Sequence, residues 1–283
     1  MKIEQPGKTL KVIVGPTASG KTDYSIELAK QYNSPIISCD SRQIYKELKI
    51  GTAPPSEEQL AQIKHYFIFS HSIFDFYTAG KYELEALELI NNLFLTHDTL
   101  IVVGGSGLYV DALCYGIDDF PDSDMILRDN LMQRLSAEGI ESLRNELRLL
   151  DPESYETIDK KNPQRIVRAL EVCLQTGKKF SSFKSSSSKQ RNFTIERTII
   201  ERPREELYDR INLRVDKMIE SGLVDEAKEL HKFKDLPALK TVGYKELFDY
   251  FDGKTSLEEA IDLIKRNTRR YAKRQITWFK RTR

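Results

Sequence analysis

The segment GPTASGKT, residues 15–22, has the residue types and the spacing of a phosphate-binding loop. It directly follows the apolar run Val12-Ile13-Val14. In a loop between a strand and a helix, the backbone N–H groups and the start of the helix can bind a diphosphate. Lys21 would neutralise that diphosphate, and the Thr22 hydroxyl could be a ligand of Mg²⁺. A glycine turn that merely begins a helix would need neither side chain. The residues predicted to bind phosphate are Gly15, Pro16, Thr17, Ala18, Ser19, Gly20, Lys21 and Thr22.

A carboxylate is expected close to this loop. A nucleoside triphosphatase or kinase would have one at the end of a later apolar strand, but the run 99–103 is followed by Gly-Gly-Ser-Gly at 104–107. Asp40 instead follows the segment Ile-Ile-Ser-Cys at 36–39. Loops at the carboxyl ends of neighbouring parallel strands face one ligand, so Asp40 can face the chemistry beside the phosphate loop. The alternative is that Asp40 caps the next helix.

Strands and helices alternate over the first part of the chain and would position these residues. Apolar runs bounded by turn residues predict strands at 10–14, 35–38, 66–69, 99–103 and 193–201. Apolar positions at helical spacing lie between them, for example in 21–32 and 81–95. This order favours a parallel sheet with helices on both faces.

From about residue 115 to 189 the pattern predicts helices and no strands. Helices are predicted at 124–137, 140–149 and 162–176, and the last has Pro163 just inside its start and Gly177 just past its end. We therefore predict an α/β fold: a P-loop NTPase-like parallel-sheet core with an inserted all-helical lobe. The core would comprise residues 1–114 and 190–283, and the lobe residues 115–189.

The composition argues against several classes of protein. The three cysteines and four histidines are scattered along the 283 residues, against a disulfide framework or a zinc site. No apolar run approaches the roughly 20 residues that span a bilayer, and the first residues have no apolar core of a signal peptide. A cytoplasmic protein without membrane contact is expected.

Charge is distributed unevenly although the net charge is only +1. Residues 265–283 contain nine Lys or Arg and no acid, so the rest of the chain has an excess of acids. Ile264, Tyr271 and Trp278 recur at heptad-like spacing and could pack, while the basic residues point elsewhere. Such a basic segment usually binds a polyanion.

Six segments resemble, in order, the motifs of bacterial tRNA dimethylallyltransferases. They are GPTASGKT, the Asp-Ser-Arg-Gln-Ile-Tyr stretch at 40–45 with Ile-Gly-Thr-Ala-Pro at 50–54, the segment 103–109, Asn-Pro-Gln-Arg at 162–165 with its continuation to 171, Val-Gly-Tyr-Lys at 242–245, and 272–278. The resemblance implies transfer of a dimethylallyl group from dimethylallyl diphosphate to N6 of the adenine 3′ of a tRNA anticodon, with diphosphate as leaving group. It also implies Mg²⁺ as cofactor, and we expect a monomer.

The same resemblance implies three catalytic residues. Asp40 matches the general base, and Thr17 matches the threonine that contacts the reacting centre or the bridging oxygen. Arg214 matches the arginine that binds the diphosphate. Arg210 is four residues earlier on the same expected helix face and could reach the same anion. The alternative for both arginines is surface pairing with nearby acids.

The tRNA-binding residues are carried over in the same way, and a face at 164–168 is plausible from helical spacing alone. A solvated charged face is the alternative there. Ser106 stands where the family usually has threonine, and it keeps the hydroxyl. The predicted set is Asp40, Ser41, Arg42, Gln43, Ser106, Arg128, Gln164, Arg165, Ile166, Val167, Arg168, Lys240, Thr241, Val242, Gly243, Tyr244, Lys245, Arg270, Lys273 and Arg274.

Three other functions stay open from the residues. An adenylate isopentenyltransferase would share the phosphate loop and donor but act on a free nucleotide, which the helical lobe and the basic end disfavour. A P-loop small-molecule kinase lacks its expected strand-end acid here. A non-enzymatic RNA-binding protein would leave Lys21, Thr22 and Asp40 without a role.

Overall fold

The predicted strands form one parallel sheet in the computed structural model, which describes residues 7–184 and 188–281. The strands are β1 (Thr9–Val14), β2 (Ile36–Ser38), β3 (His65–Tyr66), β4 (Thr99–Gly104) and β5 (Thr194–Ile199). Their order is β3-β2-β4-β1-β5. The central β1 and β4 are mostly buried on both faces, whereas β5 at the edge is largely exposed. The predicted α/β class is confirmed.

The strand predicted at 66–69 is shorter than expected. It ends at Tyr66 because Phe67 and Phe69 have φ values of 60° and 52°, outside the extended region. The N–H of Phe69 donates to the carbonyl of Gln43 at 2.9 Å, so the segment turns toward the loop after β2.

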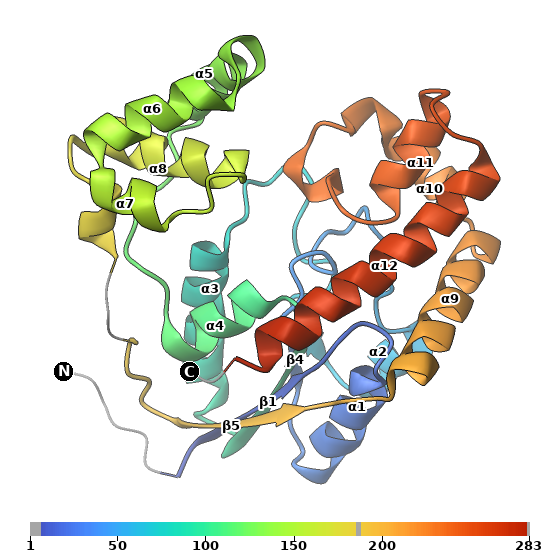
Figure 1. Ribbon diagram of the computed structural model, residues 1–283. Helices are drawn as coiled ribbons and strands as arrows, with labels where there is room; N and C mark the ends of the chain where they lie inside the picture. The colour runs from blue at the N-terminus through green and yellow to red at the C-terminus, as the bar shows by residue number, and fades with distance from the viewer. Residues whose placement is uncertain (1–6, 185–187, 282–283) are drawn as a thin grey trace. The chain divides into compact units, whose positions relative to one another are not determined.

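Eight helices accompany this sheet in the described residues. They are α1 (Lys21–Gln31), α2 (Glu57–Gln62), α3 (Ala79–Leu93), α4 (Gly107–Tyr115), α9 (Arg204–Glu220), α10 (Leu223–Leu230), α11 (Tyr244–Phe251) and α12 (Leu257–Phe279). Helix α4 was not predicted, because residues 109–114 are all buried and leave no polar face to reveal a helical period. Figure 1 shows the long α12, in dark red, running across the sheet strands beside α9 and α11.

The chain divides into two compact units, which we call the core unit (Met1–Tyr115 and Gln190–Arg283) and the lobe unit (Gly116–Lys189). The division falls one residue from the boundary that the sequence predicts at 114/115. The lobe unit contains α5 (Met125–Glu138), α6 (Ile140–Leu150), α7 (Pro152–Thr157) and α8 (Pro163–Thr176). Leu131, Leu143, Leu147 and Leu170 are fully buried in its core.

The local signals in the lobe unit act as expected. Pro163 is in the first turn of α8, and Gly177 follows the helix with φ 66°. The six-residue α7 was not predicted. It depends on Asp151, a buried side chain whose Oδ1 accepts from the N–H of Ser154 at 3.0 Å.

Candidate functional site

The predicted phosphate loop connects β1 to α1 at the carboxyl end of the sheet. Gly20 precedes α1 with φ 91°, and Ala18 has φ 63°, an uncommon conformation for a residue with a side chain. The Lys21 ammonium donates to the carbonyl of Pro16 at 3.1 Å, so its side chain folds back over the loop. The loop therefore presents the N-terminus of α1 and a lysine to the same place.

Three arginines after β5 contact consecutive residues of this loop. Arg202 Nε donates to the carbonyl of Ser19 at 2.6 Å, Arg210 Nε to the carbonyl of Ala18 at 2.8 Å, and Arg214 Nη1 to Thr17 Oγ1 at 3.4 Å. Arg210 and Arg214 occupy one face of α9, as their spacing predicts. Both side chains point to the phosphate loop and donate to its residues, and within the described part of the chain they do not form the surface pairs with nearby acids that were the alternative.

Positive charge is concentrated here. Burial, and then the nearby Arg214, lower the pKa of Lys21 to about 8, against a smaller opposing effect of Asp40. Burial and Arg210 likewise lower the pKa of Arg214. Several cations close together in a buried place favour the binding of an anionic ligand, because a nearby negative charge would raise their pKa values again.

Asp40 lies just beyond β2 and makes two backbone contacts. Its Oδ1 accepts from the N–H of Arg42 at 2.9 Å and from the N–H of Gln43 at 3.3 Å. These bonds close a turn, since residues 41–44 form turns and no helix follows. Within the described part of the chain nothing hydrogen-bonds the second carboxylate oxygen. Asp40 thus caps a turn with one oxygen and keeps the other available.

These residues line one cavity of about 210 Å³ in the core unit. Its walls include the phosphate loop, Asp40 and Arg214. Three residues of α12 also line it: Thr268, Tyr271 and Gln275. The cavity thus brings together Thr17, Lys21, Thr22, Asp40 and Arg214, which the sequence predicted as functional.

Helix α12 packs onto the glycine-rich loop that follows β4. A Cβ on Gly105 would lie 2.3 Å from Gln275 Nε2, and one on Gly107 would lie 2.4 Å from Trp278. Gln275 Nε2 donates to the carbonyl of Gly105 at 2.8 Å, and its Oε1 accepts from the N–H of Thr17 at 2.9 Å. The absence of side chains at Gly105 and Gly107 thus allows α12 to pack closely against this loop. Sequence reasoning missed Gln275, although it belongs to the 272–278 motif.

Another part of the cavity wall is a loop held by Glu226 of α10. This carboxylate accepts from the N–H groups of Lys49, Ile50 and Gly51 at 2.8, 2.8 and 2.9 Å, and from the Tyr244 hydroxyl at 2.7 Å. Four hydrogen bonds to one carboxylate fix the backbone that leads into residues 51–55 of the cavity wall. Glu226 had no role in the sequence-based prediction.

Comparison with known proteins identifies the family. Residues 43–282 match the family model described as IPP transferase. The chain is 49% identical to tRNA dimethylallyltransferase 1 of Phocaeicola vulgatus over 96% of this chain and 91% of that protein. It is 52% identical to the tRNA dimethylallyltransferase of Christiangramia forsetii over 95% of this chain and 89% of the relative. The chain belongs to the IPP transferase family.

Solved structures agree with this membership of the IPP transferase family. The full-length tRNA isopentenylpyrophosphate transferase of Bacillus halodurans superimposes with a TM-score of 0.68 and 38% identity, covering 97% of this chain and 88% of that one. A eukaryotic dimethylallyltransferase acting on tRNA gives a TM-score of 0.79 and 27% identity, covering 97% and 70%. The predicted family is therefore confirmed.

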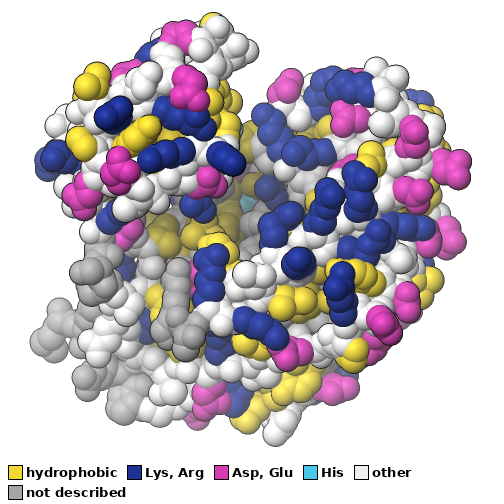
Figure 2. Space-filling model, in the orientation of Figure 1, with side chains coloured by type: hydrophobic (Ala, Val, Ile, Leu, Met, Phe, Trp, Pro, Cys, Tyr) yellow, Lys and Arg dark blue, Asp and Glu magenta, His cyan; other side chains and the backbone are white. Residues whose placement is uncertain are grey.

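The tRNA-binding residues predicted for this IPP transferase in the core unit include an exposed group and a group that holds loops together. Lys240, Lys245, Arg270, Lys273 and Arg274 are exposed, and Figure 2 shows many Lys and Arg side chains on the face that α12 crosses. Others hold loops together. Ser106 Oγ accepts a hydrogen bond from the N–H of Ser41. Arg42 Nη1 donates to the carbonyls of Pro237 and Ala238, and Gln43 Nε2 donates to the carbonyls of Thr52 and Ala53.

Tyr244 corrects the prediction in that region. Its side chain is fully buried and its hydroxyl is bonded to Glu226, so it packs the core and cannot contact RNA in this conformation. Gly243 is buried beside it, while Thr241 and Val242 are half-buried.

The lobe unit requires a similar correction. Ile166 and Val167 are fully buried in its hydrophobic core, because they occupy the inner face of α8, and their side chains cannot reach RNA. Gln164 and Arg165 are exposed at the start of the same helix. Arg128 and Arg168 are partly exposed and pair with the buried Glu171.

The remaining expectations concern metals, cysteines and membranes. Within residues 7–184 and 188–281 no three His, Cys, Asp or Glu side chains are grouped as a metal site. Cys39, Cys114 and Cys173 are buried and unbridged. Among the residues that the structure describes, no helix is long and apolar enough to cross a membrane.

Proposed function

We propose that this chain transfers a dimethylallyl group from dimethylallyl diphosphate to N6 of the adenine 3′-adjacent to a tRNA anticodon and releases diphosphate. The observation that carries the proposal is the convergence of Lys21, Arg214 and Asp40 on one cavity, in a chain of this family. The relatives named above act on tRNA or bear the name of that activity. All of these groups come from one chain, so a monomer suffices.

The phosphate loop is assigned to the leaving group. When the bond between C1 of the donor and its bridging oxygen breaks, the electron pair goes to the diphosphate. The Lys21 ammonium, the Arg214 guanidinium and the N-terminus of α1 are positioned to stabilise this charge. Thr17 Oγ1, which accepts from Arg214, lies where it can contact the bridging oxygen.

Mg²⁺ is proposed at Thr22. The Thr22 hydroxyl lines the cavity next to Lys21 and Asp23. One protein oxygen is enough, because Mg²⁺ bound to a diphosphate keeps several waters and takes its other ligands from phosphate oxygens. When bound, the ion would add Lewis-acid stabilisation of the departing diphosphate.

Asp40 is assigned as the general base. The exocyclic amine of adenine is a weak nucleophile and must lose a proton as the N6–C1 bond forms. The available oxygen of Asp40 can take that proton, while Oδ1 keeps the turn at 42–43 closed. The carboxylate therefore acts without any rearrangement of its backbone contacts.

The other candidate functions receive less support. A kinase would need an acid after β4, but that loop is Gly-Gly-Ser-Gly and its Gly105 carbonyl is bonded to Gln275. An enzyme acting on free nucleotide would have no use for the exposed Arg270, Lys273 and Arg274.

The test supplies labelled dimethylallyl diphosphate with either a tRNA that has adenine 3′ of its anticodon or AMP, and labelled ATP in a parallel reaction. Label in the tRNA alone is expected. Label in AMP alone would favour the free-nucleotide enzyme, and label transferred only from ATP would favour a kinase. No prenyl product in either reaction would refute the proposal.

A further inference from the structure

A fully buried carboxylate in the lobe unit has no role in the chemistry above. Glu171 of α8 has 0% exposure. Its Oε2 lies 2.8 Å from Arg128 Nη1, and its Oε1 lies 2.9 Å from Arg168 Nη1. Burial of a carboxylate is costly, and a well-packed apolar side chain in its place is often at least as stabilising. The stability of the lobe unit alone therefore does not explain this glutamate.

The contacts of Arg168 hold the segment that leads into α5. Its Nη1 donates to Ser123 Oγ at 3.1 Å, and its Nη2 donates to the carbonyl of Pro121 at 2.6 Å. Gln175 adds a bond from Nε2 to the carbonyl of Asp122 at 3.1 Å. Arg168 is thus largely occupied by contacts with the segment before α5, whose N-cap is Asp124.

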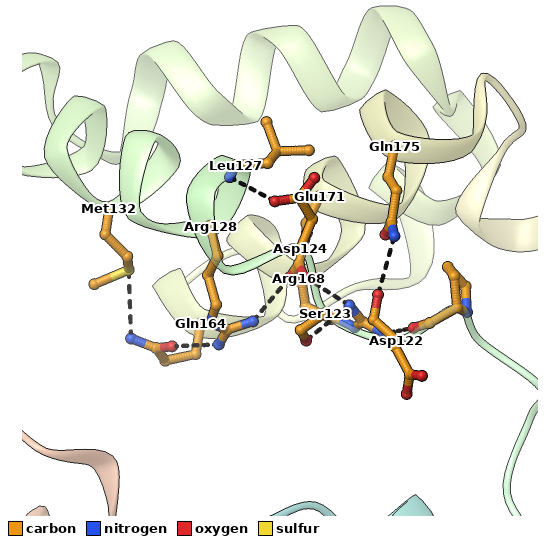
Figure 3. Close-up of polar contacts among 11 residues, drawn as sticks. Asp122, Ser123, Asp124, Leu127, Arg128, Met132, Gln164, Arg168, Glu171 and Gln175 are labelled. Carbon is orange, nitrogen blue, oxygen red and sulfur yellow. Dashed lines mark hydrogen bonds and ion pairs between the residues drawn. The ribbon is translucent and has the colours of Figure 1, made fainter. Parts of the chain in front are cut away.

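Arg128, on the first turn of α5, has a different set of contacts. Beyond Glu171, its Nη2 donates to Oε1 of Gln164 at 3.2 Å. This bond assigns the oxygen of the Gln164 amide to Arg128 and leaves the amide nitrogen, 3.8 Å from Met132 Sδ, with only a weak acceptor. Figure 3 shows Gln164, Arg128, Glu171 and Arg168 joined in a continuous series of dashed contacts.

We propose that Glu171 is a positioning residue for tRNA binding, which holds the Arg128 guanidinium and, through it, the Gln164 amide in the orientation that binds the anticodon arm. This inference rests on the proposed function. Both arginine side chains keep about a quarter of their surface accessible, 23% for Arg128 and 26% for Arg168, so an RNA can reach them. The Glu171 carboxylate also offsets the repulsion between the two guanidinium groups that it pairs with.

Charge and positioning predict opposite effects for Glu171→Gln. The substitution removes a negative charge, so long-range attraction alone would make tRNA bind more tightly and with a steeper salt dependence. Loss of the anchored guanidinium would instead weaken tRNA binding about tenfold, the order expected for one charge-assisted contact. The slope of log K against log salt would also become shallower by about 0.7 to 0.9.

Glu146→Gln is the matched control. Glu146 is in the same lobe unit, pairs with Arg134 at 2.8 Å and changes the charge equally, but it does not contact Arg128, Gln164 or Arg168 in the described structure. We expect Glu146→Gln to show only the effect of the lost charge: tRNA binding should be equal or slightly tighter, and the salt slope should not become shallower. For Glu171→Gln we expect a raised KM for tRNA with unchanged kcat and an unchanged KM for the prenyl donor.

The measurements are tRNA affinity at several salt concentrations, steady-state kinetics and the thermal unfolding temperature. Equal or tighter tRNA binding by Glu171→Gln would overturn the inference, whereas absence of tRNA binding or prenylation by the unsubstituted chain would overturn the proposed function itself. If Glu171→Gln fails to fold, Arg128→Lys decides, because it keeps the charge and loses the two-point contact. Arg128→Lys should also bind tRNA about tenfold more weakly, and unchanged affinity would refute the inference.

Discussion

Gln275 of α12 accepts a hydrogen bond from the backbone N–H of Thr17 at 2.9 Å, across 258 positions of sequence. The same amide donates to the carbonyl of Gly105, so one buried side chain connects the phosphate loop, the loop after β4 and the basic helix. Gln275 is thus placed to fix the position of Thr17.

Gln275→Ala should impair prenyl transfer. The substitution leaves the Thr17 N–H and the Gly105 carbonyl without their partner, at a cost of about 1–3 kcal/mol in unfolding free energy. Displacement of Thr17 should lower the single-turnover rate about tenfold. Denaturant unfolding and rapid quench measure the two effects. Thr277→Ala, an exposed position on the same helix, is the control, and equal rates in both variants would contradict the assignment.

The substitution Asp40→Asn distinguishes the role of Asp40 as general base from its role in capping the turn at residues 42–43. Asparagine keeps a side-chain oxygen for the N–H groups of Arg42 and Gln43, so the turn should survive and stability should change little. Loss of the proton acceptor should lower the single-turnover rate about 10²-fold or more, with much smaller effects on donor and tRNA affinity. A near-normal rate would remove Asp40 from the mechanism. Reduced donor affinity that added magnesium restores would make it a metal ligand.

Lys21 should make donor binding depend on pH. Its pKa is lowered from 10.5 to about 8, so the free protein loses this charge as pH rises through about 8. A bound diphosphate favours the protonated form, and affinity should be level below that pH and fall by up to about tenfold per pH unit above it. Calorimetry near pH 8 should detect proton uptake on binding. Lys21→Met should bind weakly and without this pH dependence, and a level affinity up to about pH 9.5 in the unsubstituted chain would refute the assignment.

The exposed basic residues of α12 should determine the salt dependence of tRNA binding. Replacing Arg270 and Arg274 by Gln should weaken binding and make the slope of log K against log salt shallower by about 1.4 to 1.8, if each contacts one phosphate. Lys30 and Lys81, exposed on α1 and α3, replaced by Gln give the same change in net charge. The prediction fails if the two double variants have the same slope.

Local sequence was sufficient for much of the fold. The apolar runs that become β1 and β4 are buried in the centre of the sheet, and the proline and glycine that bound α8 act within one helical turn. The strand at 66–69 and the unpredicted α4 show the limit. Positive φ at Phe67 ends that strand early, and complete burial of 109–114 removes the amphipathic pattern by which a helix is recognised.

The sequence by itself determined which residues could hold a diphosphate, since the phosphate loop is a contiguous motif whose spacing is its geometry. Only the tertiary structure decided which distant side chains complete it. Gln275 on Thr17, Glu226 on residues 49–51 and Glu171 on Arg128 join segments that lie far apart in the chain or on separate helices. Such contacts depend on how whole elements pack, and no periodicity along one element encodes them. The same packing buries Ile166, Val167 and Tyr244 inside motifs that sequence alone assigned to tRNA.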